Sequence, residues 1–264
     1  MRSRLLNGSR AMVIASAHGL APFIDRLALR SVLSPGEQDA LLALPFDAIT
    51  IGARRNVTRL GEISSHASFV ATGLVGRFGQ TASGQRQLTG IHLSGDMADL
   101  LSVVRPTGVG ALLALTETTI LRVPHRALRA AAAQFPAIAE AFWRHCAVDT
   151  ATLMQWLLNI GRGDAVGRLG HLMCEMAMRF GGEREYRLQF DLPLTQEQLA
   201  DATGITPVHV NRSLRRLREL KLMTICRKRV DIHDWDGLVS LSGFDPDYLA
   251  LDIGNRPKVR LLSA

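Results

Sequence analysis

A row of basic side chains between Ile205 and Arg229 is the part of the sequence best suited to binding chemistry. This segment holds eight lysines and arginines against a single acid, Glu219, while the rest of the chain carries 23 basic and 23 acidic residues. The formal net charge of +7 is therefore concentrated here. Lysine and arginine side chains that neutralise phosphates release condensed counterions, so double-stranded DNA is the expected partner.

Two helices joined by a tight corner are expected to position these charges. Thr195, with a glutamine three residues later, matches a capping box that begins the first helix. Gly204 suits the corner because glycine tolerates left-handed backbone. Thr206 followed by Pro207 then begins a second helix. Apolar residues at helical spacing predict its inward side: Val210, Leu214, Leu217 and Leu220. The pattern predicts a helix-turn-helix.

The polar side of this unit, together with a basic hairpin that follows it, forms the predicted DNA interface. Two strand-like pieces, 223–226 and 230–233, enclose three basic residues and are typical of a wing that touches phosphates. An ordinary helical hairpin with a solvated basic face is the alternative. The predicted contacts are Thr195, Gln196, Thr206, Pro207, Val208, His209, Asn211, Arg212, Arg215, Arg216, Arg227, Lys228 and Arg229.

Length and composition limit the other classes of protein. A chain of 264 residues with 47% hydrophobic residues suits two domains, and only 5% aromatic residues argues against stacking of single-stranded bases. Three distant cysteines, Cys146, Cys174 and Cys226, match neither a disulfide framework nor a cysteine metal cluster. His171 and Cys174 lie one helical turn apart, but two ligands do not complete a zinc site. We expect no metal.

The amino terminus faintly resembles a secretory signal. Arg2, Arg4 and Arg10 flank or precede the apolar run AMVIASA, which is short and rich in small residues. No apolar stretch of the sequence is long enough to span a membrane. A DNA-binding protein without a membrane partner is expected in the cytoplasm.

In the amino-terminal half, the sequence pattern changes from one typical of helices to one typical of β-strands. Residues 22–44 predict short helices, whereas 48–51, 69–78, 87–93 and 113–123 are β-prone pieces separated by glycines. This spacing is typical of a compact β-roll or barrel.

A long helix is predicted over residues 136–160, beginning at a proline. Side chains separated by alternating fours and threes form a heptad seam that we interpret as a dimer interface, although it could equally pack on its own domain. A glycine hinge, 161–163, a further helix, 164–180, and a short strand, 186–190, lead to the helix-turn-helix. The seam consists of Phe142, Cys146, Asp149, Leu153, Trp156 and Ile160.

The order of these elements resembles the Crp/Fnr superfamily of bacterial transcription factors. The resemblance is specific in TPVHVNRSLRRLREL and looser in TGLVGRF, GIHLSGDM and VPHRAL of the roll. It implies an α+β chain with a cyclic-nucleotide-binding-like β-roll, a long dimerisation helix and a winged helix-turn-helix. The corresponding ranges are an extension 1–29, a roll 30–135, a helix 136–160, a DNA-binding domain 161–238 and a tail 239–264.

The resemblance also implies a homodimer that binds a two-fold symmetric operator and recruits or blocks RNA polymerase. Relatives that read TGTGA- or TTGAT-like half-sites carry a glutamate where this chain has Val208, while the arginine four residues later is kept as Arg212. We expect Arg212 to contact guanine and Val208 to favour an A·T pair through a thymine methyl group.

An effector pocket in the roll is the other implied site, although the roll could bind nothing. The arginine that holds a cyclic phosphate in relatives is absent and Arg105 is displaced from its position, so cyclic AMP is not the expected effector. The amino-terminal cysteines of iron-sulfur sensors are also absent, and haem is left open by His66, His92 and His125. The candidate pocket residues are Gly95, Asp96, Asp99, Leu100, Val109 and Ala111.

Two other functions compete with a DNA-binding regulator. A β-roll with His92, Asp96 and Asp99 could be a cupin-like metal enzyme, but the HxH pattern and the later ligands of such a site are missing. A sensory or scaffold protein could use its winged helix to bind another protein. The localised positive charge favours nucleic acid, and we do not expect an enzyme.

Overall fold

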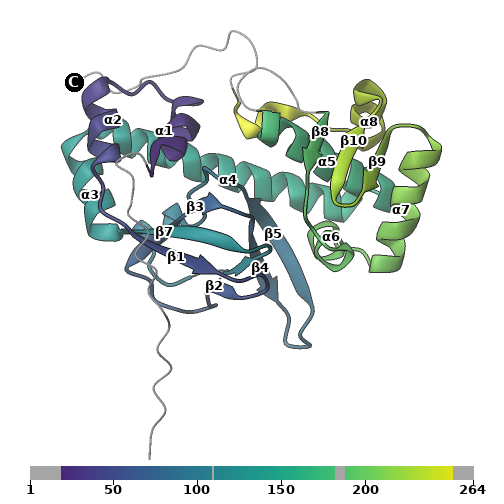
Figure 1. The fold of residues 1–264 in the computed structure, drawn as a ribbon, viewed down its shortest axis with the longest axis horizontal. Coiled ribbons are helices and arrows are strands. Elements are labelled where there is room, and N and C mark those ends of the chain that lie inside the picture. Colours follow the sequence, from purple (N-terminus) through teal and green to yellow (C-terminus); the bar gives the residue numbers. More distant parts are fainter. Residues whose placement is uncertain (1–18, 109, 182–187, 252–264) are drawn as a thin grey trace, which may run out of the picture.

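The computed structural model describes residues 19–108, 110–181 and 188–251. A β-roll lies beneath one half of a long helix, α4, and the carboxyl-terminal helices and hairpin gather around its other half (Figure 1). The amino-terminal elements are α1 (Ala21–Ala28), α2 (Pro35–Leu42), β1 (Asp47–Ile51), β2 (Asn56–Thr58), β3 (His66–Thr72), β4 (Val75–Gln80), β5 (Arg86–His92), η1 (Leu100–Val103), β6 (Ala111–Ala114), β7 (Thr118–Pro124), α3 (His125–Gln134) and α4 (Pro136–Arg162). They are followed by α5 (Ala165–Gly181), β8 (Gln189–Asp191), α6 (Gln196–Thr203), α7 (Pro207–Glu219), β9 (Met223–Cys226), β10 (Arg229–Ile232), α8 (Trp235–Ser242) and η2 (Pro246–Leu249).

Two antiparallel sheets form the roll, with strand orders β1-β7-β3 and β2-β6-β4-β5. Small and β-branched side chains from both sheets, including Val70, Val75 and Ile120, are fully buried between them. The β-prone piece predicted over 69–78 is two strands, because Gly73 turns the chain with a φ of +85°. A Cβ atom at Gly73 would lie 2.4 Å from the Glu117 carbonyl oxygen, so only glycine fits this turn.

A second core joins the roll to the helices at its end. Phe23 of α1 is fully buried and packs edge-on against Phe69 of β3, with ring centroids 6.1 Å apart. The same ring stacks on Phe142 of α4 at 6.2 Å. The predicted amino-terminal helices therefore close one end of the roll against α4.

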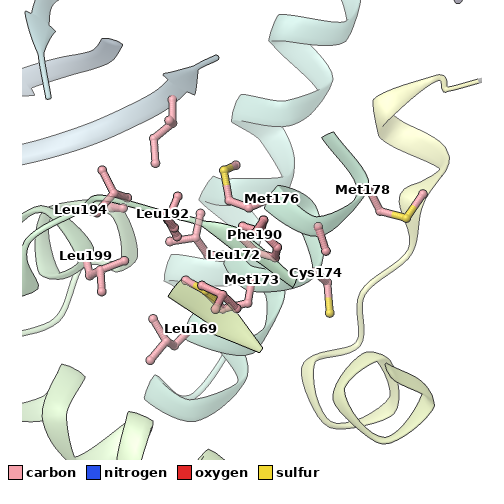
Figure 2. Close-up of a cluster of buried hydrophobic side chains, with 14 of the residues drawn as sticks. Leu169, Leu172, Met173, Cys174, Met176, Met178, Phe190, Leu192, Leu194 and Leu199 are labelled. Atoms are coloured by element: carbon pink, nitrogen blue, oxygen red, sulfur yellow. The ribbon is translucent and has the colours of Figure 1, made fainter. Parts of the chain in front are cut away.

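The third core lies in the carboxyl-terminal half and continues into the roll. Figure 2 shows leucine and methionine side chains of α5 beside Phe190 of β8, Leu192 and Leu194 of the segment that follows it, and Leu199 of α6. Leu88 and Ile91 of β5 belong to the same apolar cluster. Consequently α5 is buried along ten consecutive residues, 169–178, rather than on one side only.

A buried carboxylate fixes α4 to this core. Glu175 of α5 is fully buried, and its Oε2 accepts hydrogen bonds from Trp156 Nε1 at 2.7 Å and from the Tyr248 hydroxyl at 2.9 Å. Its Oε1 pairs with Arg179 Nη1 at 3.2 Å. A buried charge is tolerated when its lone pairs are satisfied in this way.

Residues after Gly237, in which the sequence offered no motif, form α8 and η2. Leu238 of α8 and Leu249 of η2 are buried in the third core, and Arg30 donates two hydrogen bonds to the Leu249 carbonyl oxygen. The predicted boundary at residue 238 therefore falls inside α8. The weak sequence signal has a simple cause, since eight-residue helices are stabilised by tertiary packing more than by local pattern.

Trp156→Phe is predicted to lower the free energy of unfolding of the full-length protein by about 1.5–3 kcal/mol, because it removes a hydrogen bond to a buried charge. Urea unfolding followed by circular dichroism measures this. Arg162→Lys is the control, since Arg162 is exposed at the end of the same helix and belongs to neither the core nor the exposed apolar residues of α4. Equal losses in both variants would contradict the assigned role of Glu175.

Candidate nucleic-acid interface

The helix-turn-helix consists of α6 and α7, and its local signals are confirmed. Thr195 Oγ1 accepts from the Gln198 amide at 3.1 Å while Gln198 Oε1 accepts from the Thr195 amide at 2.8 Å, which completes the capping box. Gly204 takes the left-handed conformation at the corner, with a φ of +65°. Thr206 caps α7 by accepting from the His209 amide at 3.3 Å.

The inward side of α7 differs in one position from the sequence prediction. Val210 and Leu217 are fully buried, Leu214 is partly buried, and Leu220 is 37% exposed at the end of the helix. Ser213 is buried beside them. Leu220 escapes burial because α7 ends at Glu219, and Leu222 enters the core instead.

The outward side of α7 carries the predicted contacts in exposed positions. Val208 is 67% exposed one residue after the capped amino terminus, and Arg212 follows one turn later, also exposed. Since backbone amides at a helix amino terminus attract anions, this end suits a phosphate or a base edge. Figure 1 places α7 at the edge of the molecule, away from the roll.

Several predicted contacts already have partners within the chain. Gln196 and Asn211 exchange two side-chain hydrogen bonds of 2.6 and 2.9 Å, which tie the start of α6 to α7. Arg215 and Arg216 both lie 3.9 Å from Glu219 carboxylate oxygens. Exposed ion pairs of this kind contribute little free energy. A DNA phosphate can therefore replace Glu219 as the partner of either arginine.

The predicted wing is the hairpin of β9 and β10. Its two-residue turn consists of Arg227 and Lys228, with φ values of +50° and +69°. Two consecutive left-handed residues form a tight hairpin turn, in which Asn and Gly are the usual residues. Two basic residues in this conformation carry backbone strain, and they put positive charge at the tip of the hairpin. Arg229 is held by Gln189, at 2.7 Å, and by Asp231, at 3.7 Å.

The predicted dimer seam on α4 is partly wrong. Phe142 and Trp156 are 7% and 5% exposed and pack into the chain's own cores, so neither is available to a partner helix. Asp149 lies 3.6 Å from Arg77 of the roll. Cys146 and Ile160 are half-buried, and Leu153 alone among the six is exposed.

The exposed apolar side of α4 is instead offset from the predicted seam by about one residue along the sequence. Its large apolar members are Trp143, Leu153, Met154, Leu157 and Leu158, which are between 43% and 68% exposed. A heptad pattern identifies the spacing of a seam but not which of two adjacent rows faces inward when both are apolar.

The predicted effector residues do not form one pocket. Asp96 is buried between domains, where Arg179 Nη2 lies 2.7 Å and Arg26 Nε 3.4 Å from its carboxylate oxygens. Burial alone would raise the pKa of Asp96, but these arginines hold it well below its usual value. Leu100 and Ala111 are buried core residues, and Gly95 packs beside α1. Val109 lies outside the described residues.

Among the described members of this set, only Asp99 lines a large cavity, of about 440 Å³, between the roll and α4. Its carboxylate accepts hydrogen bonds from the Ser68 amide and hydroxyl, and burial raises its pKa to about 6. Two guanidiniums that sequence reasoning did not place in a pocket, Arg77 and Arg105, line the same cavity. Residue spacing gave no signal for Arg77, because the consecutive residues Arg77, Phe78 and Gly79 of β4 all line the cavity, where the pairing of β4 with β5 shifts register.

Neither metal ligation nor catalysis is favoured by the remaining polar groups. The described residues contain no group of three or more His, Cys, Asp and Glu side chains that could hold a metal ion. His171 packs between the rings of Phe244 and Tyr248, and burial raises the pKa of the neighbouring Cys174 thiol to about 12. Within the same ranges, no helix is long and apolar enough to cross a membrane.

Comparison with known proteins identifies the carboxyl-terminal domain and shows which proteins the whole chain resembles. Residues 167–241 match the Crp-like helix-turn-helix domain. The nitrogen fixation regulation protein FixK of Rhizobium meliloti is 28% identical over 188 residues, which cover 71% of this chain and 83% of that protein. The anaerobic regulatory protein of Haemophilus influenzae is 20% identical over 228 residues, covering 86% and 89% of the two chains.

Solved structures agree over most of the chain. FixK2 from Bradyrhizobium japonicum superposes with a TM-score of 0.66 at 21% identity, covering 75% of this chain and 98% of that one. The relatives are transcriptional regulators, so the cupin-like enzyme considered above is wrong. Residues 167–241 are thus matched by the Crp-like helix-turn-helix domain, and the chain as a whole resembles regulators of the Crp/Fnr family in its sequence and in its fold.

Proposed function

We propose that this regulator binds an inverted-repeat operator as a homodimer, with one α7 in the major groove of each half-site. The exposed, capped amino-terminal end of α7 carries the proposal, because Val208 and Arg212 stand free there while Val210 and Leu217 anchor the helix from behind. The wing tip adds Arg227 and Lys228 for the phosphate backbone.

The exposed apolar row on α4 supports pairing of two copies. Trp143, Met154 and Leu157 are each at least 66% exposed, and together with Leu153 and Leu158 they line one side of a 27-residue helix. Monomeric proteins rarely leave such a continuous apolar row in water. Leu101 and Val104, 50% and 77% exposed, extend the apolar surface onto the roll. Two α4 helices packed through this row would set the spacing of the two α7 helices.

An effector would bind in the cavity of about 440 Å³ between the roll and α4. Its walls combine apolar side chains, such as Phe78 and Leu153, with two guanidiniums and three carboxylates, so a small amphipathic ligand that both donates and accepts hydrogen bonds matches the chemistry. The charged groups are those of Arg77, Arg105, Glu62, Asp99 and Asp149. Such a ligand touches α4 directly and would bias the spacing between the recognition helices. Cyclic AMP remains disfavoured, and activator or repressor action would depend on contact with, or obstruction of, RNA polymerase in the cytoplasm.

In-vitro selection of bound duplexes from random DNA by the full-length protein is predicted to enrich an inverted repeat. Half-site centres should lie roughly one helical turn apart, about 34–36 Å, because two-fold symmetry relates the α7 helices. Each half-site should hold a guanine under Arg212 and an A·T pair under Val208. A dominant cytosine under Val208 would contradict the proposed contact, and a non-repeated site would contradict the symmetric dimer.

Arg212→Ala and Lys228→Ala are predicted to affect DNA binding in different ways. Arg212→Ala should relax the preference for guanine at one position of each half-site by about 1–3 kcal/mol. Lys228→Ala should weaken binding to all sequences alike and reduce the slope of log affinity against log salt by about 1 per protomer. Fluorescence anisotropy with matched and mismatched duplexes at several salt concentrations separates the two. Equal specificity profiles would contradict these roles.

Leu157→Glu is predicted to convert the homodimer to a monomer and to weaken operator binding by tenfold or more, since a charge at the centre of an apolar interface costs at least about 1.4 kcal/mol. Sedimentation velocity reports the mass. Val32→Glu is the control, because Val32 is 43% exposed and does not belong to the apolar row on α4. A dimer that survives Leu157→Glu would place the interface elsewhere.

A further inference from the structure

A small buried cavity lies where the roll, α1, α4 and the carboxyl-terminal domain meet. It measures about 30 Å³ and is distinct from the large cavity, although Arg77, Thr89 and Asp149 line both. That volume has room for one or two water-sized species and excludes a phosphate or a nucleotide. Its other walls come from segments far apart in the sequence, which include Arg30, His92, His145 and Leu249.

Positive charge exceeds negative charge around this cavity. Four guanidiniums line it, those of Arg26, Arg30, Arg77 and Arg179, against the carboxylates of Asp96 and Asp149. The Glu175 carboxylate outside the lining also pairs with Arg179, which leaves an excess of one cation. Both carboxylates are already engaged, since Asp96 pairs with Arg26 and Arg179, and Asp149 pairs with Arg77. Buried charges of one sign are unfavourable unless an opposite charge joins them.

Arg30 is the cation left without an acidic partner. Its Nε and Nη2 both donate to the Leu249 carbonyl oxygen, at 3.3 and 3.1 Å, and it forms no salt bridge with a carboxylate of the described residues. Burial lowers the pKa of Arg30 to about 10; attraction to Asp96 and Asp149 opposes this, and repulsion from Arg26 and Arg179 adds to it. An anion beside it would relieve this repulsion.

Two buried imidazoles of this cavity have unused ring nitrogens. His92 and His145 are each 4% exposed, and neither His92 Nε2 nor His145 Nδ1 has a hydrogen-bond partner. His145 Nε2 donates to the Met97 carbonyl oxygen at 3.2 Å, so its Nδ1 is an acceptor that suits a water molecule. Burial and the adjacent Arg77 lower the pKa of His92 to about 4, so its ring is neutral at pH 7, and the tautomer with the proton on Nε2 offers a donor to the cavity. Buried polar atoms left without partners indicate a missing ligand or water.

We propose that this cavity binds a chloride-sized monovalent anion, held by Arg30 and the neighbouring guanidiniums and by the His92 ring. A larger oxyanion does not fit, and a cation is excluded by the surrounding charge. Because the walls belong to α1, the roll, α4, α5 and η2, the bound ion stabilises the docking of the DNA-binding domain on the roll.

Two measurements on the full-length protein test the anion site. Crystals grown in sodium bromide should show an anomalous peak between Arg30 and His92, because bromide replaces chloride. In parallel, thermal unfolding at constant ionic strength should shift upward by roughly 2–4 °C, and saturate, when sodium chloride replaces sodium gluconate.

Arg30→Gln should abolish the chloride-dependent shift, whatever its effect on the unfolding temperature in gluconate. Arg126→Gln is the matched control, since Arg126 is an exposed guanidinium on α3 outside the cavity, and it should keep the full shift. A cavity that contains only water in bromide, or a chloride shift that Arg30→Gln leaves intact, would overturn the proposal.

Discussion

The buried carboxylate of Asp96 is the contact on which the arrangement of the two halves depends. It follows β5 in the roll, yet its partners are Arg26 of α1 and Arg179 of α5, and the same Arg179 reaches the Ile91 carbonyl oxygen at 2.8 Å. Removal of one partner from such a network leaves an uncompensated buried charge, which costs about 3–5 kcal/mol. The roll and the DNA-binding domain are therefore coupled, because a displacement of one relative to the other would separate Asp96 from its arginine partners.

Polar contacts at the other edge of the same interface act in the same direction. Gln87 of β5 donates to the Asp201 carbonyl oxygen at 2.7 Å, and Gln198 of the capping box donates to the Leu115 carbonyl oxygen at 3.2 Å. Gln198 thus has two roles, since it completes the cap at the start of α6 and also joins α6 to the roll. A shift of the roll relative to α4 would be transmitted directly to the first helix of the helix-turn-helix.

The helix-turn-helix was predictable from the sequence because its determinants are local. Thr195, Gly204 and Thr206 act within four residues of their own positions, so spacing alone identifies them. The seam on α4 was not, because both Phe142 and its neighbour Trp143 are apolar and only tertiary packing decides which is buried. Gly73, which divides one predicted strand into two, was visible in the sequence, but its role depends on the distant Glu117.

Effector residues were the least predictable because a cavity is defined by segments that the fold brings together. Asp96 and Asp99 are three residues apart and chemically alike, yet one neutralises arginines between domains while the other lines the large cavity beside Ser68. No local pattern separates these roles. The two cavities share the Arg77–Asp149 pair, so a ligand that engages Arg77 from the large cavity weakens its hold on Asp149 of α4. The same event would change the charge facing Arg30, and this would link the proposed effector site to the junction that holds the DNA-binding domain.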